Sequence, residues 1–165
     1  AQTDALTGLY NKETTEQLTD ELLSEDENKS HAFLILDVDC FKQINDIYGH
    51  AVGDIVLQKF GKLLKGTFRE GDILGRIGGD EFGVIMKNIQ TKDIAMKKAG
   101  ELLAKTQAYK IDELKGNNIS ISIGISTAPQ DGDCYMDLYK RADQALYPLY
   151  QAKRSGKARV CNYFS

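Results

Sequence analysis

Two pairs of acidic residues each stand at the end of a short apolar run. Asp37 and Asp39 follow residues 33–36, and Asp80 and Glu81 follow two glycines between two apolar stretches. Carboxylates that are held close together repel each other unless a cation or a donor lies between them. Mg²⁺ prefers oxygen ligands and keeps positions open for substrate phosphates. We therefore predict a hard-metal site for phosphoryl or nucleotidyl transfer, formed by Asp37, Asp80 and Glu81, with Asp39 as a cap of the next helix.

The two glycines have a simpler alternative role. Gly78 and Gly79 could form a tight hairpin turn that needs positive φ. A turn of this kind needs at most one acid, so the adjacent Asp80 and Glu81 favour the metal site.

Hydrophobic patterns predict the elements that carry these acids. Residues 33–36 indicate a central strand buried on both faces, residues 72–77 and 82–86 a β-hairpin, and the alternating 118–126 a half-buried strand. Helices are expected at residues 12–27, 41–48, 52–68, 92–109 and 136–153, and a last short strand at 157–162. This order predicts an α/β (α+β) sandwich in which helices flank a mixed sheet.

Composition narrows the class of protein. The chain has 165 residues and a net charge of −3, with no dense Lys/Arg stretch, so we expect one domain over 1–165 and no nucleic-acid partner. No apolar run is long enough to cross a bilayer, so we expect no membrane contact from this segment. Three widely spaced cysteines predict free thiols in the cytoplasm. The chain starts without Met, and we expect a domain excised from a longer sensor protein, which could itself be membrane-bound.

Five ordered motifs resemble those of the GGDEF family of diguanylate cyclases. They are "DALTGLYNK" (4–12), "DVDCFKQINDIYGHAVGD" (37–54), "RIGGDEF" (76–82), "SIGIS" (122–126) and "KRADQALY" (140–147). The resemblance implies a fold like that of nucleotide cyclases and polymerase palm domains, with the signature on a β-hairpin. It also implies that two GTP molecules condense to cyclic di-GMP and two pyrophosphates, by attack of each 3′-hydroxyl on the other α-phosphate.

The implied reaction requires partners. Each domain would bind one GTP and two Mg²⁺ ions, with Mn²⁺ as an alternative, and two domains would meet as a transient homodimer. Two rival hypotheses stay open: a noncatalytic receptor for GTP or cyclic di-GMP with the same fold, and a cyclase for other nucleotides.

The resemblance also assigns residues of the metal and base sites. Asp37, Asp80 and the Val38 carbonyl would bind metal, Asp80 would act as the base for the 3′-hydroxyl, and Glu81 would shape the site. Asn45 and Asp54 would bind the guanine edge, although a helix-end cap and a helix N-terminal acid are their simpler alternatives. The remaining substrate contacts implied are His50, Lys42, Leu6, Leu57, Gly79, Lys153 and Lys157.

Some of these contacts have structural arguments of their own. Leu57 falls outside the apolar stripe of its helix, which favours a base contact over a core role. Gly79 would leave room for the ribose and phosphates, and Lys42 would contact phosphate, although solvated surface is the usual place for Lys. Residues 148–150 are an apparent insertion before Lys153 and Lys157, which shifts Lys153 along the axis of the last helix while keeping it near the expected face.

A second site is implied eleven residues before the acidic turn. Arg69 and Asp72 match the RxxD site at which many diguanylate cyclases bind their product. Arg can stack on guanine and form paired hydrogen bonds, and Asp can accept from guanine N–H groups. A surface ion pair is the alternative.

Overall fold

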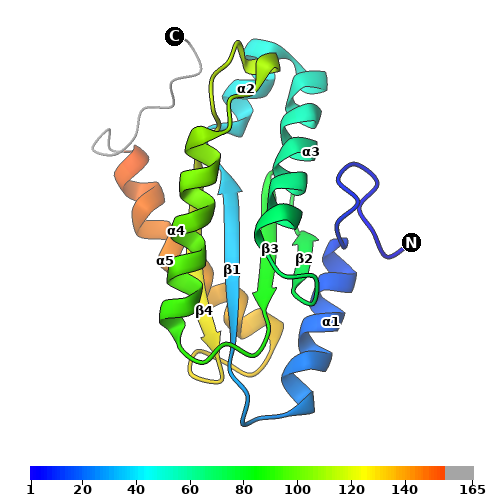
Figure 1. The fold of residues 1–165 in the computed structure, drawn as a ribbon, viewed down its shortest axis with the longest axis vertical. Helices are drawn as coiled ribbons and strands as arrows, with labels where there is room; N and C mark the ends of the chain where they lie inside the picture. The colour runs from blue at the N-terminus through cyan, green and yellow to red at the C-terminus, as the bar shows by residue number, and fades with distance from the viewer. Residues whose placement is uncertain (155–165) are drawn as a thin grey trace.

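The structure of the protein is a computed structural model, which describes the backbone of residues 1–154 and the side chains of residues 1–146. Its helices and strands are shown in Figure 1. The helices are α1 (Lys12–Glu25), α2 (Phe41–Tyr48), α3 (His50–Thr67), α4 (Lys92–Ala108) and α5 (Tyr135–Arg154). The strands are β1 (His31–Val38), β2 (Ile73–Arg76), β3 (Glu81–Met86) and β4 (Ile121–Ala128).

The element order confirms the prediction from the sequence as far as the last helix. Asn11 caps α1 as its flanking position suggests, with its side chain accepting from the Thr14 N–H at 2.9 Å. The final strand predicted at 157–162 lies outside the described residues.

The four strands form one sheet in the order β2-β3-β1-β4. Each neighbouring pair is antiparallel, so these strands do not form the mixed sheet that we expected, although the α+β class is confirmed. The helices α2 and α3 carry the chain from β1 to the sheet edge at β2, and the hairpin then returns β3 alongside β1.

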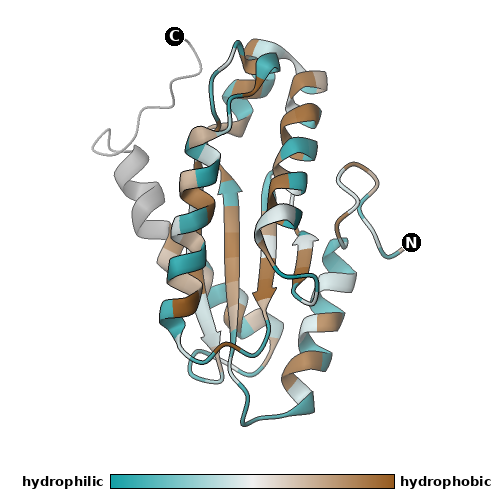
Figure 2. Cartoon of the chain, in the orientation of Figure 1, coloured by the Kyte–Doolittle hydropathy of each residue, from teal (hydrophilic) through white to brown (hydrophobic). Residues whose placement is uncertain are grey.

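Helices cover both faces of this sheet (Figure 1). One core cluster joins the sheet to α3 and α4 through Leu34, Leu36 and Val84, and the other joins it to α1 and α5 through Phe33 and Ile35. Residues of β1 therefore alternate between two buried faces, which confirms β1 as a central strand. In Figure 2 this strand is hydrophobic along most of its length and hydrophilic at its tip, where Asp37 ends the apolar run.

Strand β4 is buried more fully than its alternating sequence predicts. Ile121 and the preceding Ile119 contribute to the α3/α4 core, and Ser122 and Ser126 on the opposite face are also buried. The prediction of a half-buried strand is wrong because α5 covers the face formed by serine and glycine. Small residues allow this close packing, and the Ser126 hydroxyl donates to the Leu138 carbonyl of α5 at 2.7 Å.

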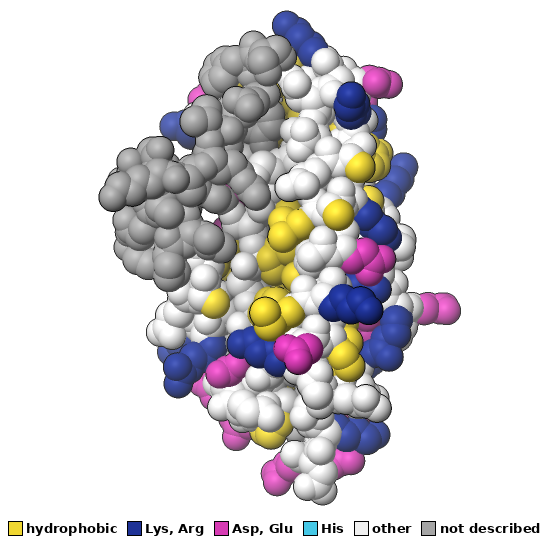
Figure 3. Space-filling model, turned by 60° about the vertical axis from the view of Figure 1, so that its left-hand side comes forward, with side chains coloured by type: hydrophobic (Ala, Val, Ile, Leu, Met, Phe, Trp, Pro, Cys, Tyr) yellow, Lys and Arg dark blue, Asp and Glu magenta, His cyan; other side chains and the backbone are white. Residues whose placement is uncertain are grey.

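The structure can be compared with the expectations on cysteines, on membrane-spanning segments and on the spread of Lys and Arg. Cys40 is disulfide-bonded and Cys134 is free, so the expectation of three free thiols is wrong. Among the described residues, none of the helices has both the length and the apolarity needed to span a membrane. Lys and Arg side chains are interspersed with Asp and Glu on the face shown in Figure 3.

Candidate active site

The predicted acids meet at one end of the sheet. Asp37 of β1 lies directly opposite Glu81 of β3 in the antiparallel register, and the Val38 N–H donates to the Asp80 carbonyl at 3.2 Å. Burial, followed by the neighbouring carboxylates of Glu81 and Asp80, raises the pKa of Asp37 to about 7. Burial also raises the pKa of Asp80 and of Glu81. Such a cluster favours a bound cation, because a cation would compensate the charges that burial disfavours.

The turn between β2 and β3 is held by an arginine. Arg76 donates through Nε and Nη2 to the Gly79 carbonyl at 3.1 and 2.8 Å, and through Nη1 to Asp4 at 3.1 Å. Neither Gly78 nor Gly79 has a positive φ, so the predicted need for left-handed backbone is wrong. Gly79 is exposed, and a Cβ there would meet no atom within 4 Å in the described structure, which leaves open surface beside the acids.

Glu81 has a hydrogen-bond partner that the sequence did not reveal. The Tyr139 hydroxyl of α5 donates to Glu81 Oε1 at 2.8 Å. Residues 135, 138, 142 and 146 form a buried stripe along α5, which indicates the face that Tyr139 shares. The stripe predicts that Tyr139 faces the sheet, but the identity of its partner follows only from the packing of α5.

Asp39 does not cap α2, which corrects the prediction. The cap residue of α2 is Cys40, with a φ of 55° and no side-chain capping bond. Asp39 is buried and accepts from the hydroxyls of Ser120 and Ser122, each at 2.6 Å. Two short bonds from hydroxyl donors hold this carboxylate against β4, where a cap would offer it a single backbone donor.

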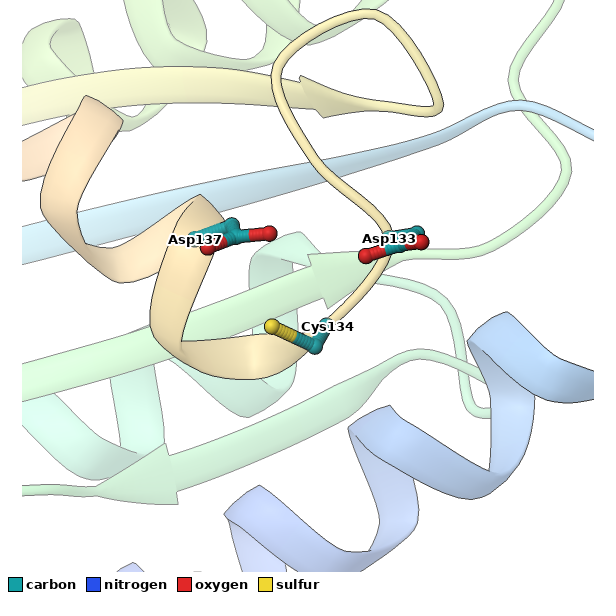
Figure 4. Close-up of side chains that lie close together, drawn as sticks. All are labelled: Asp133, Cys134 and Asp137. Atoms are coloured by element: carbon teal, nitrogen blue, oxygen red, sulfur yellow. The ribbon is translucent and has the colours of Figure 1, made fainter.

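The carboxylates of Asp37, Asp80 and Glu81 fit a hard divalent cation, although their oxygen atoms do not all lie close to one another. Asp37, Asp80 and Glu81 offer carboxylate oxygens at one sheet end, the ligands that Mg²⁺ prefers. Within the described residues, however, the acids and thiols whose ligand atoms all lie within 4.8 Å of one another are Asp133, Cys134 and Asp137. Figure 4 shows this second group at the start of α5. Exposed acidic groups are common on protein surfaces, so we assign it no metal.

The predicted base-binding residues lie on α2 and α3. Asn45 lies in α2 with its Oδ1 buried and, among the described residues, without a hydrogen-bond partner, so the alternative role of a side-chain helix cap is not supported. Asp54 is exposed on α3 but outside its first turn, where α3 has no acid, so the helix N-terminal role is not supported either. Lys42 and His50 are exposed, on α2 and at the first residue of α3.

The two predicted leucines differ in burial. Leu6 is partly buried against the α3/α4 core, and Leu57 is a core residue that is only 1% exposed. The inference that Leu57 lies outside the core because it leaves the apolar stripe is wrong. Leu57 lies four residues after Gly53 and three before Phe60, both buried, so it shares the buried face of α3.

The remaining predicted site residues are the pair Arg69 and Asp72 and the two lysines Lys153 and Lys157. Arg69 has a largely exposed side chain that donates to Asp72 and to the Lys87 carbonyl. The Asp72 side chain is 1% exposed and accepts from the backbone N–H groups of Arg69 and Lys87 at 3.2 and 3.1 Å. Asp72 therefore holds Arg69 in place and has no exposed surface of its own for a nucleotide. Lys153 and Lys157 lie outside the residues whose side chains are described.

The curated proteins that are similar to this chain include a diguanylate cyclase. Diguanylate cyclase A of Treponema denticola is 37% identical over 139 residues, which are 83% of this chain and 36% of that protein. The chain thus spans less than half the length of the curated relatives it matches first.

Solved structures agree with the fold. The GGDEF domain of TpbB from Pseudomonas aeruginosa has a TM-score of 0.84 and 35% identity, covering 95% of this chain and 90% of that one. The GGDEF domain of DgcB from Caulobacter crescentus, in complex with c-di-GMP, has a TM-score of 0.82 and 27% identity, covering 100% and 97%. The family model described as "Diguanylate cyclase, GGDEF domain" matches residues 1–159, so the chain belongs to the GGDEF family of diguanylate cyclases.

Proposed function

We propose that this domain is an active diguanylate cyclase that condenses two GTP molecules into cyclic di-GMP. The observation that carries the proposal is the register of Asp37 against Glu81 beside Asp80, which joins three partly buried acids at one sheet end. The family membership supports the same reaction.

The proposed step is a nucleotidyl transfer carried out twice. A 3′-oxygen of one GTP forms a bond to the α-phosphorus of the other, and the bond from that phosphorus to the pyrophosphate oxygen breaks. The electron pair leaves with pyrophosphate, and the 3′-hydroxyl proton passes to the Asp80 carboxylate.

The chain would hold the metal and the nucleotide with separate groups. Asp37, Asp80 and the Val38 carbonyl would bind two Mg²⁺ ions, or Mn²⁺, and a bound cation would stabilise charge that develops on the phosphate. Glu81 would support the site, with Tyr139 fixing its orientation. Asn45 and Asp54 would recognise guanine.

The other substrate contacts would surround this centre. Leu6 and Leu57 would line the base pocket from the core side, and His50 from the start of α3. Lys42, Lys153 and Lys157 would contact phosphates, and Gly79 would leave space for the ribose. We place the reaction in the cytoplasm and between two domains that meet transiently.

The direct test is incubation of concentrated protein with GTP and Mg²⁺, with products identified by mass spectrometry. We expect cyclic di-GMP and pyrophosphate from the wild type and no cyclic di-GMP from Asp80→Ala. Asp93→Ala is a matched control, because Asp93 is exposed in the first turn of α4. Binding of GTP or cyclic di-GMP without product would contradict the proposal and support the receptor alternative.

We also propose that the product inhibits the domain at Arg69. The exposed guanidinium is held by the buried Asp72, so it can stack on a guanine without first being ordered. Arg69→Ala should raise the cyclic di-GMP concentration for half-inhibition by about tenfold or more, which corresponds to the loss of roughly 1.4 kcal/mol. Turnover without product should stay unchanged. Equal inhibition of both proteins would exclude Arg69 from the product site.

A further inference from the structure

Asn45 of α2 is partly exposed, and its side-chain oxygen Oδ1 lies against Gly53 of α3. Of its two polar atoms, only Oδ1 is both fully buried and without a hydrogen-bond partner in the described part of the chain. A buried acceptor without a partner is costly, so a native structure retains one where another requirement outweighs the cost.

Gly53 of α3 provides the space for this oxygen. A Cβ at position 53 would overlap Asn45 Oδ1 and would lie 3.1 Å from Asn45 Cγ and 3.2 Å from Phe41 Cζ. The φ of Gly53 is not positive, so the backbone would accept another residue, and alanine is the better helix former. The glycine is therefore required by the neighbouring side chain and not by its own backbone.

The position of Oδ1 decides which end of the amide can meet a nucleotide. With Oδ1 against α3, the group left for recognition is Nδ2, which is a donor. Guanine presents the acceptors O6 and N7 on one edge, whereas adenine presents its N6 amino donor in place of O6. A donor fixed at this place favours guanine and leaves a donor facing a donor when adenine binds.

We infer that Gly53 is a specificity-determining residue that positions Asn45 for guanine, an inference that rests on the proposed function. Gly53 touches no nucleotide itself and acts through Asn45. Asp54, the next residue of α3, is expected to accept from the N–H groups of the same base, so any shift of α3 against α2 would disturb both contacts.

The test compares Gly53→Ala with Gly66→Ala in the same helix. A Cβ at position 66 would meet nothing within 4 Å in the described structure, so Gly66→Ala changes helix propensity alone. The probes are GTP and ATP analogues with a methylene group between the α and β phosphorus atoms, which bind but cannot release pyrophosphate. We expect Gly53→Ala to weaken the guanine analogue about tenfold, equivalent to one lost hydrogen bond, and to lower its preference over the adenine analogue. Gly66→Ala should bind both analogues like the wild type.

A double-mutant cycle shows whether Gly53 acts through Asn45. Asn45→Ala removes the amide that a Cβ would strike, so adding Gly53→Ala should cause no further loss of affinity. Wild-type affinity in Gly53→Ala, or losses that multiply in the double variant, would overturn the inference.

Thermal unfolding needs no nucleotide, so it tests the role of Gly53 independently of the proposed function. Gly53→Ala should lower the melting temperature in the wild-type background and raise it in the Asn45→Ala background, where alanine only improves the helix. If the wild type binds neither analogue, the proposed function fails, and the melting temperatures still decide whether Gly53 makes room for Asn45. If Gly53→Ala raises the melting temperature in both backgrounds, the inference is overturned.

Discussion

Tyr135 and Tyr139 lie one turn apart on α5, yet their hydroxyl groups have different surroundings. Tyr139 donates to Glu81 at 2.8 Å. The Tyr135 hydroxyl is buried and has no partner among the residues that the structure describes, although its ring packs edge-on against Phe33 with 5.5 Å between ring centroids. The two positions therefore separate the effect of a hydroxyl on the acidic site from its effect on packing.

Tyr139→Phe should lower turnover by about three- to tenfold, since Glu81 loses a donor worth roughly 1 kcal/mol. The ring stays in place, so the fold should be retained. The measurement is the rate of cyclic di-GMP formation at saturating GTP and Mg²⁺.

Tyr135→Phe is the matched control. It should leave turnover unchanged and raise the free energy of unfolding by up to about 1 kcal/mol, because it removes a buried hydroxyl that lacks a partner. Equal turnover in both variants would show that the Tyr139–Glu81 bond has no part in the reaction.

At the scale of elements, the contact between β4 and α5 determines how the acidic site is closed. The backbone of α5 approaches Gly124 so closely that a Cβ there would overlap the Ala142 carbonyl and lie 3.1 Å from Ile35 Cγ2. This approach brings Tyr139 of α5 to Glu81 of β3. The small residues of β4 thus connect a packing requirement to the geometry of the site.

Gly124→Ala should destabilise the fold by about 1–3 kcal/mol, the usual cost of overpacking a close contact. The obstacle is the α5 backbone, which cannot rotate away as a side chain can. Urea unfolding measures the change. Gly100→Ala on α4 is the control, since a Cβ there meets nothing within 4 Å of the described atoms, and it should stabilise by up to about 1 kcal/mol.

The first residue of β1 provides a pH-dependent contact. His31 is buried and its Nδ1 accepts from the Asn88 N–H at 3.0 Å. Burial, followed by the nearby Lys29 and Lys87, lowers the pKa of His31 below its usual 6.5, while Glu25 and Asp26 oppose this shift. The folded protein therefore keeps His31 neutral at pH values where the unfolded chain binds a proton.

Stability from His31 should accordingly be complete above about pH 6.5 and should decrease as the pH falls through the range below it. Protonation would also remove the acceptor that the Asn88 N–H needs. Urea unfolding at several pH values should show a smaller loss at acidic pH in His31→Gln, whose amide oxygen can accept without titrating. Parallel curves for the two proteins would contradict this role.

At the scale of the whole molecule, the β2–β3 hairpin is tied to the N-terminal segment of the chain. Arg76 joins the turn to Asp4, the Tyr10 N–H donates to the Leu74 carbonyl of β2, and the Tyr10 carbonyl accepts from the Arg76 N–H. The acids are thus fixed at one open end of the sheet, where they can face a second molecule. The proposed chemistry needs that second molecule, because each domain would supply one GTP.

The rate per domain should therefore rise with protein concentration at saturating GTP and approach a plateau when most domains are paired. The measurement is initial rates over a hundredfold range of concentration, and Asp80→Ala is the inactive control. A rate per domain that is constant over this range, in a protein that sedimentation shows to be monomeric, would exclude the two-domain mechanism.

Much of the fold could be predicted from local patterns. The helix α3 and the apolar run of β1 depend on neighbours in sequence, and these elements were predicted correctly within a few residues. The meeting of Asp37 with Glu81 was also anticipated, since strand ends and hairpin turns collect at sheet edges. The burial of the serine face of β4 was not anticipated, because it depends on which helix packs against it.

The sequence by itself determined the family, the positions of the acids and the order of the elements, since motifs and periodicity are properties of neighbouring residues. Only the tertiary structure decided that Asp39 accepts from Ser120 and Ser122, that Tyr139 bonds to Glu81 and that Gly53 makes room for Asn45. Each of these contacts joins different elements of the chain. Their partners are selected by how helices and strands pack, and no local pattern records that choice.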